Sequence, residues 1–88
     1  MLEKQRAEID AIDREIVSLF ERRMQVVMDV ARIKKENEMA IFDASREKEV
    51  IVKVQSYLTD EGLKEELREV YETLMKVSKD YQKIQMDE

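Results

Sequence analysis

Residues 2–37 contain neither proline nor glycine, and this uninterrupted stretch constrains the fold more than any other feature of the sequence. Apolar side chains recur within it at steps of three and four residues, which is the spacing of one face of an α-helix. The stretch therefore predicts one long helix from Leu2 to about Asn37. The apolar positions that mark its buried face are Ile9, Ile12, Ile16, Leu19, Phe20, Val27 and Val30.

Two shorter helices are predicted after the long one. Asp43 is placed to cap the second helix, and residues 59–62 are expected to form the turn before the third. Residues 50–54 have strand propensity, but the chain offers no partner strand, so a helix is expected there. The expected buried side of the second helix is Val50, Val54 and Leu58, and the third is marked by Leu63, Leu67, Val70, Tyr71, Leu74, Val77 and Tyr81.

The first helix is too long for a compact chain of this size. About 35 residues of helix reach roughly 50 Å, whereas a compact globule of this length has a diameter of roughly 30 Å. The apolar stripe follows the overshooting part and would face water unless another chain covered it. We therefore predict an all-α fold with three helices per chain, in which residues 1–88 form a single domain of a helical homodimer.

Composition excludes several classes of function. The chain has no cysteine and no histidine, so a disulfide framework, a Cys/His zinc site and a nucleophile activated by histidine are excluded. Its 21 acidic and 16 basic residues give a net charge of −5 with no basic block, so nucleic acid is not an expected partner. With no long apolar run and no signal segment, the expected location is the cytoplasm rather than a membrane.

Two cations interrupt the apolar face of the first helix. Arg23 lies seven residues after Ile16 and seven before Val30, and therefore falls on the stripe. Lys34, eleven residues further, returns to within about 20° of the same direction. The alternative is that both side chains lay their stems on the core and keep their charges in water. Two cations on one face of an acidic chain favour a pocket for an anion.

Polar residues also occupy inner positions of the other two helices. Ser78 and Gln82 lie four residues apart on the inner line of the third helix, where a frayed helix end is the alternative explanation. Asp43, Arg46 and Glu47 cluster at the start of the second helix, where capping and a solvated face are the alternative. Together these groups suit binding a small polyanion and stabilising charge that develops on oxygen.

The order and spacing of these residues resemble the all-helical chorismate mutase family, the AroQ class. The resemblance spans the chain from Arg6 to Gln82. It is carried by Arg6-Ala7-Glu8-Ile9-Asp10-Ala11-Ile12-Asp13, by Glu21-Arg22-Arg23, by Lys34, by Asp43-Ala44-Ser45-Arg46-Glu47, and by Ser78 with Gln82.

The resemblance implies a homodimer with intertwined first helices and two equivalent active sites that convert chorismate to prephenate in phenylalanine and tyrosine biosynthesis. Neither a metal nor another cofactor is expected. Arg6 is expected to enter the partner's site, because 17 residues of helix place it about 25 Å from Arg23. The residues expected in the chain's own site are Arg23, Lys34, Asp43, Arg46, Glu47, Ser78 and Gln82.

The resemblance also implies roles for these side chains. The cations of Arg6, Arg23 and Lys34 would hold the two substrate carboxylates, and Lys34 with Gln82 would donate to the ether oxygen. Acceptors for the ring hydroxyl would be Glu47 and Asp43, while Ser78 or Arg46 would position the ring side.

Two other functions are compatible with the same residues. An isochorismate pyruvate-lyase shares the fold and the cations, although Asp43 and Glu47 together favour the mutase. A non-catalytic helical dimerisation module is the alternative from another class. One departure from the family concerns residues 38–42, which lack the usual glycine or proline, so a more ordered or partly helical loop is expected there.

Overall fold

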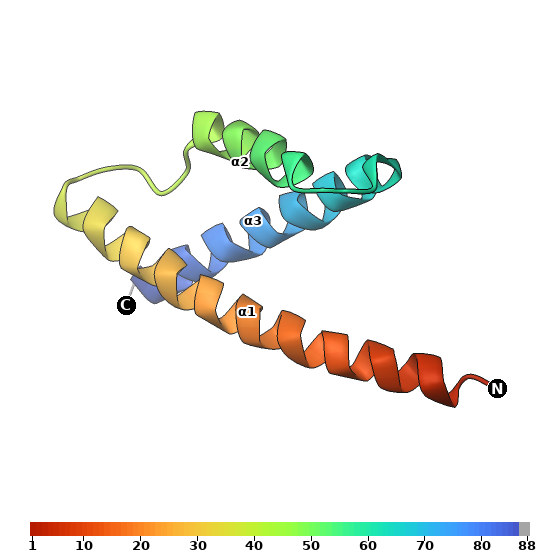
Figure 1. The fold of residues 1–88 in the computed structure, drawn as a ribbon. Coiled ribbons are helices and arrows are strands. Elements are labelled where there is room, and N and C mark those ends of the chain that lie inside the picture. Colours follow the sequence, from red (N-terminus) through yellow and green to blue (C-terminus); the bar gives the residue numbers. More distant parts are fainter. Residues whose placement is uncertain (87–88) are drawn as a thin grey trace.

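The computed structural model describes residues 1–86 of the chain. It contains three α-helices, α1 (Glu3–Glu36), α2 (Ala44–Ser56) and α3 (Lys64–Met86), and one short 3-10 helix, η1 (Glu61–Leu63), that leads into α3. Both α1 and α2 pack against α3, as Figure 1 shows. No strand occurs within residues 1–86, so the predicted all-α fold with three helices is confirmed. The homodimer stays a prediction.

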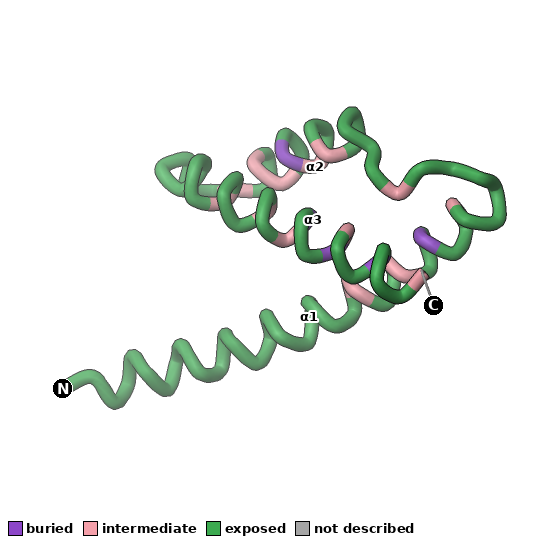
Figure 2. Tube along the Cα trace, turned by 180° about the vertical axis from the view of Figure 1, so that it is seen from behind, coloured by how far each residue is buried: buried purple, intermediate pink, exposed green. Residues whose placement is uncertain are grey.

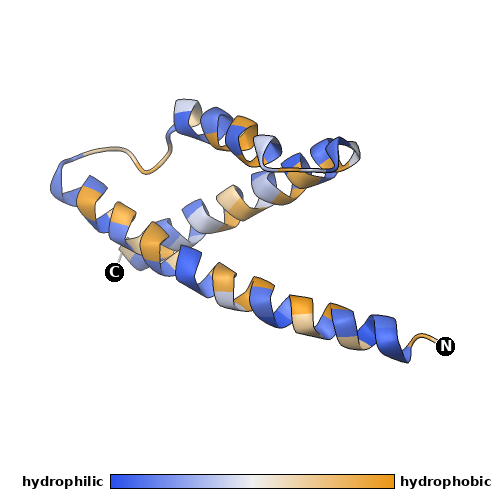
Figure 3. Ribbon diagram, in the orientation of Figure 1, coloured by the Kyte–Doolittle hydropathy of each residue, from blue (hydrophilic) through white to orange (hydrophobic). Residues whose placement is uncertain are grey.

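Helix α1 extends well beyond the rest of the molecule. Its 34 residues make the chain 54 Å long, with a radius of gyration of 15.9 Å, whereas a compact chain of this length has about 12 Å. Ile9, Ile12 and Ile16 are 54–56% exposed, and the N-terminal part of α1 is exposed throughout in Figure 2. Apolar residues recur along this same part in Figure 3. The described chain therefore leaves the N-terminal part of the predicted apolar stripe of α1 uncovered.

A left-handed residue ends α1. Glu38 has a φ of 55°, its N–H donates to the Lys35 carbonyl at 3.2 Å, and the Met39 N–H donates to the Lys34 carbonyl at 2.7 Å. This pair of bonds is the Schellman motif, in which one residue usually occupied by glycine reverses the chain. Of the two predicted forms of this loop, the partly helical one is wrong, because this reversal sends the chain back across the end of α1 and residues 38–42 contain no helix.

The start of α2 agrees with the sequence prediction. Asp43 has an extended backbone, and its carboxylate accepts a hydrogen bond from the Arg46 N–H at 3.0 Å. This N-cap satisfies one of the donors left unpaired at a helix start. Residues 50–54 are helical, as predicted.

The buried side of α2 differs from the prediction. Ile51 is 7% exposed, whereas Val50, Val54 and Leu58 are only half-buried. Val50 borders a cavity, described below.

The connection between α2 and α3 contains a second aspartate N-cap. The Asp60 carboxylate accepts a hydrogen bond from the Gly62 N–H at 2.9 Å and starts η1. Helix α3 then runs to Met86 and buries Met75, Ser78 and Gln82. Two of its three buried residues are therefore polar. No helix among residues 1–86 is both long enough and apolar enough to cross a membrane.

Candidate active site

A cavity of about 280 Å³ lies between the C-terminal half of α1, the start of α2 and α3. Its apolar lining includes Val27, Ile41 and Met75. The residues of the predicted site that line it are Arg23, Lys34, Asp43, Arg46, Glu47, Ser78 and Gln82. The fold thus brings together seven side chains that are separated by up to 59 positions in the sequence.

Positive charge predominates in the lining of this cavity. The cationic side chains are Arg23, Lys34, Arg46 and Lys79, and the anionic ones are Asp43 and Glu47. The lining therefore carries a formal charge of +2 in a chain whose net charge is −5. A concave site with this sign of charge attracts an anion.

The guanidinium of Arg23 is held by α3. Its Nη1 donates to the Ser78 hydroxyl at 3.1 Å, and that hydroxyl donates in turn to the Leu74 carbonyl at 2.7 Å. The guanidinium also lies 5.9 Å from the centre of the Tyr71 ring, a contact that sequence reasoning missed. A guanidinium has five N–H donors, so the bond to Ser78 leaves others to bind an anion in the cavity.

Gln82 supplies a buried amide to the site. The residue is 6% exposed, and its side-chain Nε2 donates to the Val27 carbonyl of α1 at 2.8 Å. The alternative of a frayed helix end is wrong, because α3 continues to Met86 and both Ser78 and Gln82 are buried. An amide NH₂ carries two protons, so one remains to donate into the cavity.

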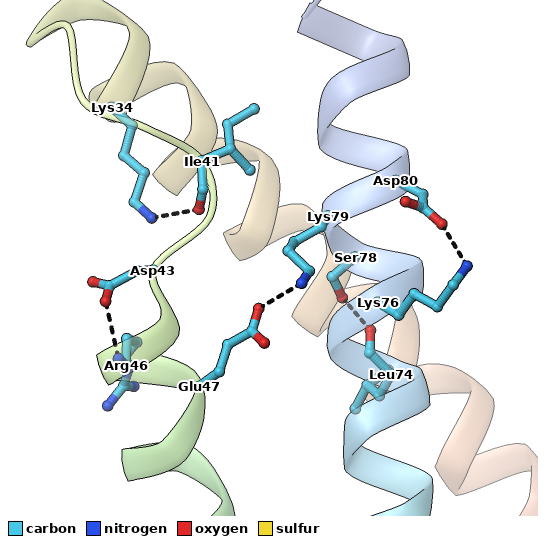
Figure 4. Close-up of polar contacts among 10 residues, drawn as sticks. All are labelled: Lys34, Ile41, Asp43, Arg46, Glu47, Leu74, Lys76, Ser78, Lys79 and Asp80. Carbon is cyan, nitrogen blue, oxygen red and sulfur yellow. Dashed lines mark hydrogen bonds and ion pairs between the residues drawn. The ribbon is translucent and has the colours of Figure 1, made fainter.

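Lys34 is half-buried at the C-terminal end of α1. Its ammonium donates to the Ile41 carbonyl at 3.0 Å (Figure 4). This partner is a neutral carbonyl of the loop between α1 and α2, which returns across the end of α1 after the left-handed residue Glu38. Two further protons of the ammonium are available to a ligand.

The structural roles predicted for Asp43 and Arg46 are present. Asp43 caps α2, and the Arg46 side chain forms an ion pair with Glu49 at 3.0 Å. Both side chains of this ion pair are more than half exposed. Both residues line the cavity, but their polar contacts are made within α2.

Glu47 has a partner that sequence reasoning missed. Its carboxylate lies 3.0 Å from the Lys79 ammonium, and Figure 4 shows the two side chains pointing toward each other from α2 and α3. The ammonium also lies 4.4 Å from the centre of the Phe42 ring. The available signal was a lysine directly after the inner Ser78, but its pairing depends on how α2 packs on α3.

Arg6 does not join these residues. It is exposed on the N-terminal part of α1 and is not among the residues that line the cavity. A role for Arg6 therefore needs a second chain and stays a prediction.

The sequence was compared with known protein families. Residues 5–83 match the family model described as chorismate mutase type II. No curated protein and no solved structure matches the chain at a significant level.

Proposed function

The chain belongs to the chorismate mutase type II family, and on this premise we propose that it is an isomerase that rearranges chorismate to prephenate. The observation that carries the proposal is the cavity. Its lining has a formal charge of +2, and it includes Arg23, Lys34 and Gln82, each held by an internal hydrogen bond. Chorismate is a small dianion, so its charge complements that of the lining.

Substrate binding is assigned to the cations. Arg23 offers a planar fork of donors to one carboxylate, and Lys34 offers a point charge. Holding both carboxylates folds the enolpyruvyl arm over the ring and brings the two reacting carbons together. Such positioning contributes a large part of the acceleration of a unimolecular reaction.

The chemical step needs no base and no nucleophile. One C–O bond breaks as a C–C bond forms within the same molecule, and negative charge develops on the ether oxygen. We assign Lys34 and Gln82 as donors to that oxygen, because each has protons beyond those used in its internal bond. Donors aimed at this oxygen stabilise the transition state more than the bound substrate.

The ring side of the substrate is assigned to α2. Glu47 is the proposed acceptor for the ring hydroxyl, since it is half-buried at the cavity whereas Asp43 is exposed. Arg46 is assigned to the ring side with it. Ser78 instead acts through Arg23, whose guanidinium it binds.

A second copy of the chain completes the proposed enzyme. The uncovered apolar stripe on α1 supports a homodimer in which the first helices pack together. A cavity of about 720 Å³ on α1 and α3, lined by residues such as Phe20, Val77 and Tyr81, adds to the apolar surface that a partner would cover. In this arrangement the partner subunit's Arg6 enters the site and joins Arg23 and Lys34 in holding the substrate carboxylates. Roles in phenylalanine and tyrosine biosynthesis and a cytoplasmic location stay predictions.

The proposal is tested by mixing purified protein with chorismate and, separately, with isochorismate, and following the loss of each substrate's absorbance. We expect turnover of chorismate alone. Preferred turnover of isochorismate would instead indicate the lyase. The variant Arg23→Ala, checked for helix content, should lose activity. A folded wild-type protein that leaves both substrates unchanged would indicate a non-catalytic helical module.

A further inference from the structure

Lys79 lines the cavity but has no part in the mechanism described above. Its ammonium is 3.0 Å from the Glu47 carboxylate and 4.4 Å from the centre of the Phe42 ring. These three residues come from α3, from the first turn of α2 and from the loop before α2. Lys79 therefore connects α3 to the segment that carries the proposed hydroxyl acceptor.

The surroundings of this ion pair differ from those of a surface pair on the same helix. The side chains of Lys79 and Glu47 are 26% and 28% exposed, whereas those of Lys76 and Asp80 are 74% and 53% exposed at the same 3.0 Å separation. Lys76 holds the pKa of Asp80 below its ordinary value through a hydrogen bond and its charge. That exposed pair joins two residues of one helix and is screened by solvent. The Lys79–Glu47 pair joins two helices at the cavity wall, where screening is weaker.

The partner of Lys79 argues against a direct role in binding the substrate. Arg23 and Lys34 make their internal polar contacts with neutral acceptors, the Ser78 hydroxyl and the Ile41 carbonyl. Lys79 instead lies against a carboxylate, which neutralises much of its charge. Its influence on a bound anion is therefore smaller than its influence on Glu47.

We propose that Lys79 is a positioning residue that orients Glu47 toward the substrate hydroxyl. Its ammonium holds Glu47 Oε2, which sets the direction in which the other carboxylate oxygen accepts. Contact with the Phe42 ring also helps to keep the ammonium in place. This role rests on the proposed function, because it needs a substrate with a hydroxyl group at that end of the cavity.

A double-mutant cycle on Lys79 and Glu47 tests the positioning role. The variant Lys79→Met keeps an apolar stem near Phe42 and removes the charge. We expect it to lower kcat/KM for chorismate about tenfold in the wild-type background and less than about twofold in the Glu47→Gln background. The reason for the difference is that Lys79 acts through the charge of Glu47. The conservative Lys79→Arg keeps the ion pair and should stay within about threefold of wild type.

The matched control is Lys76→Met, which removes a lysine from the same helix outside the cavity and should leave kcat/KM unchanged. An equal loss from Lys79→Met in both backgrounds would assign Lys79 to the substrate directly and overturn the positioning role. Unchanged kcat/KM in Lys79→Met would overturn it as well. Absence of turnover by both the wild type and Lys76→Met would instead overturn the proposed function itself, so the two failures are distinguishable.

Discussion

Arg23 of α1 donates a hydrogen bond to the Ser78 hydroxyl of α3 across 3.1 Å, joining residues 55 positions apart. The same hydroxyl donates to the Leu74 carbonyl one turn earlier at 2.7 Å. Ser78 is 5% exposed, whereas Arg23 is half-buried, so the bond between them is partly shielded from solvent. The hydroxyl therefore holds a guanidinium at the cavity wall, and its contribution to catalysis should pass through Arg23.

Replacing Ser78 by alanine should disorder the Arg23 guanidinium without removing its charge. Hydrogen bonds to charged groups contribute about 1.5–3 kcal/mol, and loss of about half of that lowers kcat/KM by roughly fourfold to tenfold. Steady-state kinetics with chorismate measures the effect. Thr73→Ala is the matched control, because the Thr73 hydroxyl makes the same kind of bond to the Glu69 carbonyl on an exposed part of α3. Equal kinetics in both variants would contradict the role of Ser78.

Replacing Lys34 by alanine should impair catalysis much more than stability. Loss of a donor to developing charge typically costs about 10²- to 10³-fold in rate, whereas the lost bond to the Ile41 carbonyl is a single half-buried contact. Kinetics and a thermal melt on the same preparation separate the two effects. Lys35→Ala, at the exposed neighbouring position, should be near wild type in both. A near-normal rate in Lys34→Ala would exclude Lys34 from the reaction.

Replacing Gln82 by glutamate should make activity depend on pH. Only the protonated acid can donate to the Val27 carbonyl or to the ether oxygen, while the ionised form offers acceptors to both. Activity should therefore be present at low pH and fall as the pH rises through the pKa of the new carboxyl. Substrate carboxylates raise that pKa and Lys34 lowers it, so the prediction concerns the direction alone. Wild type should show no such decline over the same range, and a flat profile for Gln82→Glu at the wild-type level would remove Gln82 from the ether oxygen.

Replacing Glu38 by glycine should stabilise the protein. A side chain in the left-handed region costs about 1–2 kcal/mol, and the greater flexibility of glycine in the unfolded chain offsets about 0.5–1 kcal/mol of the gain. A net gain of about 0.5–1 kcal/mol raises the melting temperature by a few degrees at fixed protein concentration. Glu38→Gln keeps the strained backbone and serves as the control for charge. A lower melting temperature in Glu38→Gly would contradict the assigned Schellman motif.

Mixing two inactive variants should restore activity if the site is shared between subunits. In a heterodimer of Arg6→Ala and Arg23→Ala chains, one of the two sites keeps both arginines. Activity after subunit exchange should therefore rise from near zero toward a quarter of the wild-type level, since about half of the dimers are mixed and each has one intact site. Exchange shown by mass-tagged subunits without recovery would contradict a site built from two chains.

The helices and most of the polar residues that line the cavity could be predicted from the sequence, because local spacing indicates them. The repeat of apolar residues defines α1, and Arg23 and Lys34 stand out because they interrupt that repeat. Ser78 and Gln82 stand out on α3 for the same reason. A polar residue on an apolar helix face can be recognised from the sequence alone, and these four residues do line one cavity.

Other features depend on packing between elements and could not be predicted. The pairing of Lys79 with Glu47 requires the relative placement of α2 and α3, which no local pattern encodes. Glu38 takes a left-handed backbone without the glycine or asparagine that usually signals it. Ile51 is the buried residue of α2, whereas Val50 borders the cavity, and this difference also depends on how the helices pack.

The most direct test of the proposed function is the stoichiometry of the reaction with chorismate. Prephenate and pyruvate are both quantified while purified wild-type protein consumes a known amount of chorismate. A rearrangement keeps all atoms in one product, so we predict one prephenate for each chorismate lost and no pyruvate above the protein-free control. Release of pyruvate, or no loss of chorismate beyond that control, would contradict the account.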